Sequence, residues 1–494
     1  MNVDVIVAGA GPTGLMLAGE LALAGVRTVV VERLPERGGQ SKALGLQPRS
    51  AEVLDLRGLL EPLMDRAIQR VPGGHFAGLR LDLDVWDTRH PYMIGIPQTR
   101  VEAVLEERLG ALGVQVLRGH ELTALAQDPG GVTATLRGPA GPVRLRGRYL
   151  AGCDGGRSTV RSLLEIDFPG LDGRLSSVVA DITLADPDGA VPATWHLPVM
   201  TPSKVGRGYL APIGEGVHRF LFYGPEQQDL PRDTPIGEGE VGRALLNAAG
   251  PGVKLTGIRW ASRFTDASRQ VESYRHGRVL LAGDAAHIHS PMGGQGLNLG
   301  LQDAFNLGWK LAAEINGWAP EGLLDTYHAE RHPVAARVLA NTRAQAVLLV
   351  PDEENLALRG IVAELLRLPE GNRHVAGMVS GLDIRYDLPG DPHPLLGRRV
   401  PDLDLRTPGG PERVGRLLRD GRALLLSAAD GTAFAEVARP WSARVGHLAA
   451  SDTGELGAEA VLVRPDGYVC WAGSAGETAS LVTALTRWAG SPSA

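Results

Sequence analysis

The first 32 residues contain the pattern that most restricts the fold of this chain. A short apolar run at residues 3–8, VDVIVA, leads into the glycine-rich turn GAGPTG, and an apolar helical pattern then continues to Gly25. A second apolar run, VRTVVVE, ends at Glu32. This order of strand, glycine turn, helix and strand predicts a βαβ unit, and therefore an α/β domain built on a parallel sheet.

The three glycines of the turn have the spacing GxGxxG, which is typical of dinucleotide-binding folds. We expect Gly9 to allow the tight turn, Gly11 to leave room for a pyrophosphate, and Gly14 to let helix and strand pack closely. The phosphates would lie at the helix N-terminus, where Glu32 could accept a hydrogen bond from a ribose hydroxyl. An acidic residue at this position favours FAD or NAD over NADP.

The same spacing occurs a second time, in GEGEVG at Gly237, Gly239 and Gly242. In a chain with 65 glycines such a match can arise by chance, so the pattern alone is weak evidence. The second match follows DLPRDTPI, which is not the pattern of a buried strand. We therefore interpret it as an acidic loop that binds no nucleotide.

A later glycine-rich segment, GDAAHIHSPMGGQGLN at residues 283–298, favours FAD over NAD. It follows the apolar run RVLLA and ends where a helical pattern begins. Asp284 could bind a ribityl hydroxyl, while backbone N–H groups at the helix start could face the pyrimidine edge of a flavin. His287 and His289 lie in the same segment, but the sequence offers no third ligand nearby, so we expect no metal site.

A third glycine-rich turn, GCDGGRSTVR at residues 152–161, contains Asp154. In this order the dinucleotide fingerprint, the DG motif (Asp154-Gly155) and the GD motif (Gly283-Asp284) resemble the class A flavoprotein aromatic monooxygenases, the family of para-hydroxybenzoate and phenol hydroxylases. The resemblance continues through LQDAFNLGWKLA, LLDTYHAERHPVA, HPLLGRRVPDL and RPDGYVCWAG, and so covers nearly the whole chain. Within the family the chain is most similar to aromatic polyketide antibiotic hydroxylases, of tetracycline and angucycline type, and to rifampicin monooxygenase.

The resemblance implies a mixed α/β (α+β) fold in three parts. We expect residues 1–176 and 274–390 to form a Rossmann-like FAD-binding domain, residues 177–273 to form a mixed-sheet substrate domain, and residues 391–494 to form a thioredoxin-like C-terminal domain. The last part follows the Pro/Gly-rich stretch LPGDPHP and has no CxxC motif. We therefore expect it to be structural, without thiol redox chemistry.

The expected cofactor contacts combine the glycine-rich motifs with positions that the resemblance adds. They are Gly9, Gly11, Thr13, Gly14, Glu32, Arg33, Lys42, Gln98, Leu122, Asp154, Asp284, Pro291, Gly296, Leu297 and Asn298. Lys42 departs from the arginine that is usual in the family, which replaces a bidentate contact by a point charge and is similar to tetracycline-type members. Pro291 matches the proline whose backbone lies near the reactive edge of the flavin.

The substrate is expected between the flavin and the middle domain. His218, Phe220 and Phe222 share one face of an expected strand and are the candidate substrate contacts, although the two phenylalanines could equally belong to the core. His218 could assist the deprotonation of a phenol, and Arg49 could stabilise substrate or peroxide. No residue is assigned as catalytic, because the flavin carries the chemistry and Arg49, Pro291 and His218 are only candidates.

The resemblance implies an FAD-dependent monooxygenase that consumes O2 and hydroxylates a polycyclic aromatic phenol through a flavin C4a-hydroperoxide. Since one dinucleotide fold is evident, NADPH or NADH is expected to bind transiently as reductant. Three alternatives stay open: Baeyer–Villiger oxygenation of a polycyclic ketone, inactivation of an antibiotic instead of its biosynthesis, and a flavoprotein that only sequesters its ligand.

The remaining features concern partners and location. The net charge of −6 provides no basic field for nucleic acid. No apolar run approaches the roughly 18 residues of a membrane span, and the N-terminus has no basic region typical of a signal peptide. We therefore expect a cytoplasmic protein whose partners are small molecules, and the sequence leaves its oligomeric state open.

Overall fold

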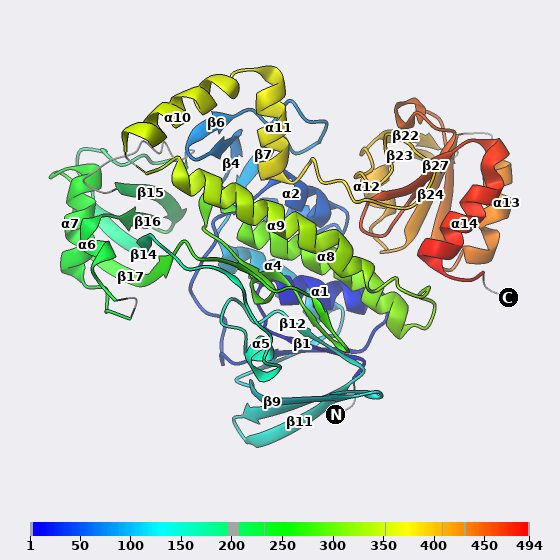
Figure 1. The fold of residues 1–494 in the computed structure, drawn as a ribbon, viewed down its shortest axis with the longest axis horizontal. Coiled ribbons are helices and arrows are strands. Elements are labelled where there is room, and N and C mark those ends of the chain that lie inside the picture. Colours follow the sequence, from blue (N-terminus) through cyan, green and yellow to red (C-terminus); the bar gives the residue numbers. More distant parts are fainter. Residues whose placement is uncertain are drawn as a thin grey trace.

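A computed structural model describes residues 3–195, 207–231, 233–350, 352–407, 409–428 and 431–492. Figure 1 shows a central nucleotide-binding part, with the sheet of β14 to β17 at one end of the long axis and the C-terminal domain at the other. This arrangement is the mixed α/β fold in three parts that the sequence predicts.

A six-stranded sheet forms the centre, in the order β19-β20-β12-β1-β2-β8. Its parallel strands are β1 (Val5–Ala8), β2 (Thr28–Glu32), β8 (Gln115–Arg118), β12 (Tyr149–Gly152) and β20 (Val279–Leu281), and β19 (Arg275–His276) is antiparallel. Helix α1 (Pro12–Leu23) connects β1 with β2, which confirms the predicted βαβ unit. Residues of β1, β12 and β20 are buried throughout, because helices and loops cover both faces of such a sheet.

Two long helices cover the sheet on the side of α1. Helix α8 (Gly296–Ile315) packs directly on α1, and α9 (Thr326–Val347) packs on α8 (Figure 1). The close approach depends on Gly308 of α8, where a Cβ would lie 2.4 Å from the Cβ of Glu20 on α1. The N-terminus of α8 is thereby held beside the carboxyl end of the parallel strands.

The middle part is an antiparallel sheet in the order β15-β16-β14-β17, and not the expected mixed sheet, because each of its three strand pairs is antiparallel. Its strands are β14 (Ser176–Ala185), β15 (Arg207–Gly214), β16 (Val217–Tyr223) and β17 (Lys254–Thr265). Helix α7 (Glu238–Ala249) packs on its outer face (Figure 1). The interpretation of GEGEVG as a loop is wrong, because Gly237 is the N-cap of α7 and Val241 and Leu245 of the same helix are buried against the sheet.

Smaller elements connect these parts. The strands are β3 (Gly45–Leu46), β4 (Gln69–Pro72), β5 (Gly74–Phe76), β6 (Leu79–Leu81), β7 (Tyr92–Gly95), β9 (Glu121–Asp128), β10 (Gly131–Gly138), β11 (Gly141–Gly147), β13 (Gly170–Leu171), β18 (Ser268–Gln270) and β21 (His287–Ile288). The helices are α2 (Pro48–Asp55), α3 (Leu60–Met64), α4 (Gln98–Ala111), α5 (Thr159–Leu163), α6 (Pro225–Gln228), α10 (Glu353–Leu365) and α11 (Pro369–Ser380).

The C-terminal domain has the thioredoxin-like order of strand, helix, strand, two further strands and a final helix. These elements are β24 (Ala423–Ala428), α13 (Thr432–Ala438), β25 (Val445–Ala450), β26 (Ala460–Val463), β27 (Val469–Gly473) and α14 (Thr478–Ala489). Strands β24 and β25 are parallel, and the other neighbours in the order β25-β24-β26-β27 are antiparallel. The hairpin of β22 (Asp404–Thr407) and β23 (Gly410–Arg413), followed by α12 (Val414–Leu417), precedes this core.

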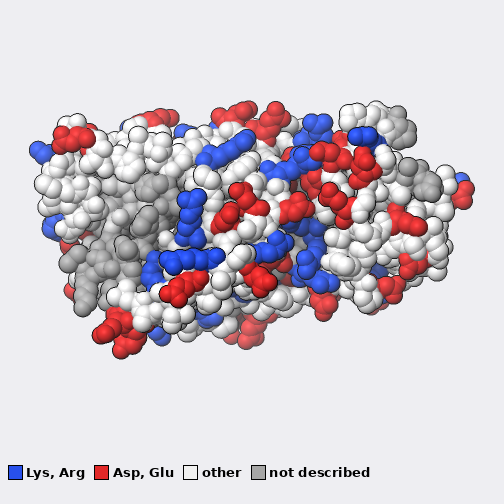
Figure 2. All heavy atoms as spheres, turned by 90° about the horizontal axis from the view of Figure 1, so that it is seen from above, with Lys and Arg blue, Asp and Glu red and all other residues white. Residues whose placement is uncertain are grey.

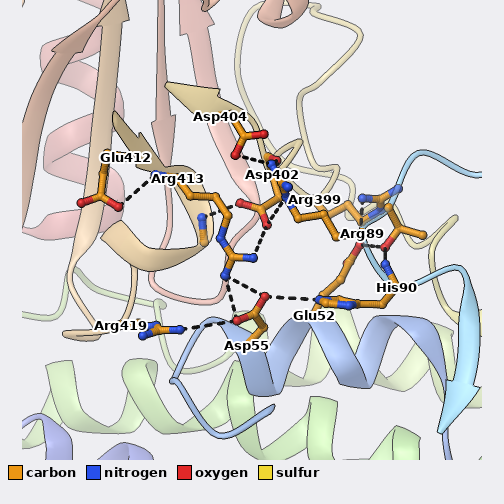
Figure 3. Close-up of polar contacts among 12 residues, drawn as sticks. Glu52, Asp55, Arg89, His90, Arg399, Asp402, Asp404, Glu412, Arg413 and Arg419 are labelled. Atoms are coloured by element: carbon orange, nitrogen blue, oxygen red, sulfur yellow. Dashed lines mark hydrogen bonds and ion pairs between the residues drawn. The ribbon is translucent and has the colours of Figure 1, made fainter. Parts of the chain in front are cut away.

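Ion pairs join the C-terminal domain to α2 (Figure 3). Asp55 of α2 accepts from the Arg413 guanidinium at 2.8 Å, and Glu52 pairs with Arg399 at 3.0 Å. His90 approaches Asp55 at 3.2 Å from the side of the nucleotide-binding part. Although burial opposes it, hydrogen bonding to His90 and Arg413 holds the pKa of Asp55 below its usual range. The Asp55 carboxylate therefore stays charged, and the ion pairs of Asp55 and Glu52 hold the two parts together.

The surface carries mixed charge. On the face drawn in Figure 2, positive and negative side chains alternate over the middle of the molecule. Within the described part of the chain, no helix is both long enough and apolar enough to cross a membrane.

Both cysteines are buried, one beside the glycine turn and one in β27. Burial raises the pKa of the Cys153 and Cys470 thiols, so thiolate formation is disfavoured at both. We expect the double variant Cys153→Ala/Cys470→Ala to keep its FAD and to turn over within a few-fold of the unaltered protein. Steady-state NAD(P)H oxidation measures this, and a collapse of activity in a folded, flavin-loaded variant would show that a thiol takes part.

Candidate functional site

The three glycines of the first turn differ in backbone conformation and in the space around their Cβ positions. Gly9 has φ +103°, and a Cβ there would lie 2.5 Å from the carbonyl oxygen of Cys153. A Cβ at Gly14 would lie 2.0 Å from the carbonyl oxygen of Gly9. Gly11, by contrast, has no heavy atom within 4 Å of its Cβ position. The protein itself therefore requires Gly9 and Gly14, while the space at Gly11 is open to a ligand at the N-terminus of α1.

Glu32 ends β2 beside this turn. Its carboxylate accepts hydrogen bonds from the backbone N–H of Ala10 and of Leu34, both at 2.9 Å. Arg33 is exposed next to it. The carboxylate is thus fixed beside the glycine turn, where the sequence predicts a ribose contact.

The GD motif forms a short turn, Gly283–Ala285, directly after β20. Asp284 is exposed on this turn. Beneath it, the buried Asp303 carboxylate accepts from the N–H of Gly283 at 3.2 Å and pairs with His287 at 2.7 Å and Arg331 at 2.8 Å. Burial opposes ionisation, but Arg331 and His287 hold the pKa of Asp303 below its usual value. His287 thus supports the turn through Asp303.

Asn298, in the first turn of α8, joins three backbone segments. Its Oδ1 accepts from the N–H of Gln47 at 2.7 Å, and its Nδ2 donates to the carbonyls of Gly45 (3.1 Å) and Gly294 (2.8 Å). The side chain of Gln47 in turn donates to the carbonyl of Gly293 at 2.7 Å. Sequence reasoning missed Gln47, because its partners lie some 250 positions away and no local pattern marks the contact.

The DG motif leaves a buried acceptor without a partner. Asp154 accepts from the N–H of Val160 at 3.0 Å through Oδ2, whereas its Oδ1 is buried and has no geometrically formed hydrogen bond to the residues that the structure describes. Burial raises the pKa of this carboxyl group. Arg161 ties the DG turn to the GD turn by donating to the carbonyl of Ala285 at 3.0 Å.

Two further acceptors near the loop before α8 are also buried and unpaired within the described chain, Gln47 Oε1 and His289 Nε2. Unsatisfied buried acceptors are costly and call for a donor. FAD carries ribityl hydroxyls and a ring N–H, so its donor groups match these acceptors, and the open space at Gly11 matches its pyrophosphate. The residues present therefore fit FAD.

The other expected contacts lie around these turns. Lys42 is exposed between Ser41, whose Oγ accepts from the N–H of Gln98 at 2.7 Å, and Ala43, whose N–H donates to the Gln98 side chain at 3.2 Å. Thr13 packs against Gly283, and the Leu122 side chain is buried in β9. Pro291 is exposed, while Gly296 and Leu297 are half-buried at the start of α8.

The strand β16 has the expected alternation, but its predicted substrate face is turned away from the nucleotide-binding part. Phe220 and Phe222 are 0% and 1% exposed and stack in the core under α7. His218 lies on the same face, and burial lowers its pKa. The packing of Phe220 and Phe222 fits the alternative of core residues and not a substrate contact, whereas His218 is half-buried and stays a candidate.

The opposite face of β16 meets the nucleotide-binding part. Arg219 pairs with Asp181 of β14 at 2.6 Å and donates to the carbonyl of Ser41, in the segment that leads to Lys42. Leu221 and Tyr209 are neighbours on this face, where burial raises the pKa of the Tyr209 phenol. This face, and not that of Phe220, lies towards the segment of Ser41 and Lys42.

Arg49 does not reach this region. Its guanidinium pairs with Glu52 at 2.8 Å and donates to the carbonyl of Asp466 in the C-terminal domain at 3.1 Å. It also lies 4.8 Å from the ring centre of Tyr468. The candidate role of Arg49 at substrate or peroxide does not fit these contacts, because α2 directs the side chain into the domain interface.

The comparisons with known proteins cover the whole chain. The family model of the FAD binding domain matches residues 2–342, and that of the aromatic-ring hydroxylase C-terminal region matches residues 393–492. The 12-dehydrotetracycline 5-monooxygenase/anhydrotetracycline 6-monooxygenase of Streptomyces rimosus is 48% identical, with 100% of both chains covered. The rifampicin monooxygenase of Streptomyces venezuelae is 46% identical over 99% of both. The solved structure of an anhydrotetracycline hydroxylase from Streptomyces rimosus has a TM-score of 0.91 at 48% identity and covers 100% of both chains.

Proposed function

This chain belongs to the family of FAD-dependent aromatic-ring monooxygenases, and from that premise we propose that it hydroxylates a polycyclic aromatic phenol of the polyketide type. The observation that carries the proposal is the full-length similarity to enzymes named for tetracycline and rifampicin substrates. The substrate sheet supports it, since Arg219 joins that sheet to the segment before Lys42. NADPH or NADH would be the reductant, and the cytoplasm the compartment.

The chain's residues would hold FAD along one continuous cradle. The open space at Gly11 would take the pyrophosphate, Glu32 a ribose hydroxyl, and Asp154 and Asp284 hydroxyls of the ribityl chain. The N-terminus of α8, with its free N–H groups, would face the pyrimidine edge. When bound, FAD supplies hydride acceptance from NAD(P)H and the activation of O2. The same proposal includes the other expected cofactor contacts. It also includes the expected domain boundaries, which lie at residues 176/177, 273/274 and 390/391.

The substrate would lie between this cradle and the sheet face of Arg219, Leu221 and Tyr209. Arg219 pairs with Asp181 and donates to the carbonyl of Ser41, so it connects the sheet to this loop. The apolar part of the face would exclude water from the reacting ring. In this arrangement the protein binds and orients the phenol and keeps the site dry.

The test is whether a polycyclic phenol accelerates flavin reduction. Flavin reduction would require the flavin ring to move to a position that NADPH can reach. A bound substrate that favours this position by about 1.4 kcal/mol would increase its population relative to the other position tenfold. We therefore expect faster bleaching of the oxidised flavin by NADPH when anhydrotetracycline or an angucyclic phenol is present. Stopped-flow absorbance measures the rate, and mass spectrometry should find a product heavier by one oxygen atom. Equal bleaching rates across a panel of such phenols, with only hydrogen peroxide formed, would contradict the proposal.

The chemical structure and the antibacterial activity of the product also distinguish the proposed function from its alternatives. A new phenol or alcohol carbon in the NMR spectrum indicates hydroxylation, whereas a new ester carbon from a ring ketone indicates Baeyer–Villiger oxygenation. Loss of antibacterial activity of the product would favour drug inactivation. A protein that binds the phenol tightly but never consumes NAD(P)H would be a sequestering flavoprotein.

A further inference from the structure

We propose that Trp195 is a substrate contact that selects polycyclic ligands carrying a ring carbonyl, whose oxygen its indole N–H would bind. This inference rests on the proposed function and deepens it. Trp195 precedes the substrate sheet's β15 in the chain, yet its contacts are with the nucleotide-binding part.

The backbone of Trp195 is held at both polar groups by one side chain. Its N–H donates to Gln69 Oε1 at 3.0 Å, and its carbonyl accepts from Gln69 Nε2 at 2.5 Å. Gln69 begins β4, which pairs with β7. This two-point contact fixes the residue against β7, so the position of the ring is determined by the sheet.

The ring lies on two glycines that leave room for it. A Cβ at Gly95 would be 2.4 Å from Cε3 of the indole, and a Cβ at Gly45 would be 3.5 Å from its Cη2. Gly45 and Gly95 are directly paired between β3 and β7. Any larger residue at Gly95 would displace the ring, so this part of the sheet is shaped to receive an aromatic side chain.

The same glycine leads to the proposed cofactor cradle. The carbonyl of Gly45 accepts from Asn298 Nδ2 at 3.1 Å, and Asn298 is in the first turn of α8. One hydrogen bond therefore separates the Trp195 platform from the helix end that would face the flavin. An aromatic ring beside this helix end can stack on a polycyclic substrate, because aromatic rings attract one another at centroid separations of roughly 4.5–7 Å.

The benzene half of the indole contacts the glycines, while the other half carries Nε1. This nitrogen is buried and has no partner among the residues that the structure describes. A buried N–H without an acceptor costs free energy, which an oxygen of a ligand would recover. A carbonyl oxygen on a fused ring system supplies both this acceptor and the flat surface for stacking.

The experiment compares two ligands that share a phenolic hydroxyl and differ in ring carbonyls, 1-hydroxyanthraquinone and 1-hydroxyanthracene. Binding to the FAD-loaded protein is titrated through the flavin absorbance spectrum. Trp195→Phe keeps the ring and removes the donor, so we expect it to weaken binding of the anthraquinone by about 5- to 30-fold and that of the anthracene by less than about 2-fold. Gly95→Ala should displace the ring and weaken both.

The matched control is Trp488→Phe, which removes another buried indole N–H without a described partner, in α14 of the C-terminal domain. It should bind both ligands like the unaltered protein, and an equal loss there would overturn the inference. Unchanged preference in a Trp195→Phe protein of full FAD content would also overturn it, while leaving the proposed function intact. If the unaltered protein bound neither these nor any other polycyclic phenol, the proposed function would fall and the inference with it.

Discussion

Replacing Gly11 by valine is expected to give a folded protein that no longer retains FAD. No heavy atom lies within 4 Å of the Cβ position, and the backbone there has φ −78°, which any residue adopts. The fold therefore tolerates the side chain, but the side chain would occupy the space left for the pyrophosphate. Loss of most of the phosphate contacts should weaken FAD binding by more than about 100-fold, on the order of 3 kcal/mol or more.

The flavin-to-protein absorbance ratio after purification measures this effect, and circular dichroism reports the fold. Asp284→Ala should also lower FAD content, because the exposed carboxylate of the GD turn would lose its hydroxyl contact. Gly239→Ala is the matched control, since it changes the second GxGxxG match, which lies in α7. The assignment of the first turn would be wrong if Gly239→Ala lost as much flavin as Gly11→Val.

Glu330→Gln is expected to destabilise the protein by about 3–5 kcal/mol, because it breaks a fully buried ion pair. Glu330 of α9 accepts from both terminal nitrogens of Arg464, at 2.7 and 2.8 Å, and pairs with Lys310 of α8 at 2.9 Å. Both cations are completely buried. Despite burial, Arg464 and Lys310 lower the pKa of Glu330 to about 2. A neutral amide would leave Lys310 without its paired carboxylate and Arg464 paired with Asp466 alone.

Since Arg464 comes from the C-terminal domain, the loss should also loosen that domain from the two long helices. Urea unfolding should show a lower midpoint, and limited proteolysis should cut faster around residues 388–394. Arg406→Ala is the control, because Arg406 is paired with Asp452 at 3.2 Å but the two side chains are 84% and 51% exposed. Such a pair contributes at most about 1 kcal/mol, so similar losses in both variants would contradict the argument.

Several features followed from the sequence because the physical cause is local. Gly9 needs a positive φ and Gly14 a close backbone contact, and both requirements arise within one turn of strand and helix. The position of Asp284 directly after a buried strand can likewise be recognised from a few consecutive residues. These short-range constraints were enough to predict the central parallel sheet, and the resemblance extended the prediction to the thioredoxin-like domain.

Other features depended on packing that the sequence does not encode locally. The segment at Gly237 and Gly239 has low intrinsic helix propensity, but the apolar stripe of Val241 and Leu245 buries against the sheet and stabilises α7. The polar contacts of Gln47 join segments some 250 positions apart. Arg49 sits on a short helix whose surroundings come from the C-terminal domain, so its partner carbonyl could not be foreseen.

Strand β16 shows most clearly which features depend on the sequence alone and which depend on the tertiary structure. Alternation along the sequence determined which side chains share a face, with Phe220 on one side and Arg219 on the other. It could not determine which face turns to the nucleotide-binding part, because a period of two is the same from either side. Only the tertiary structure decided this, by covering the Phe220 face with α7 and by setting Arg219 between Asp181 and the carbonyl of Ser41.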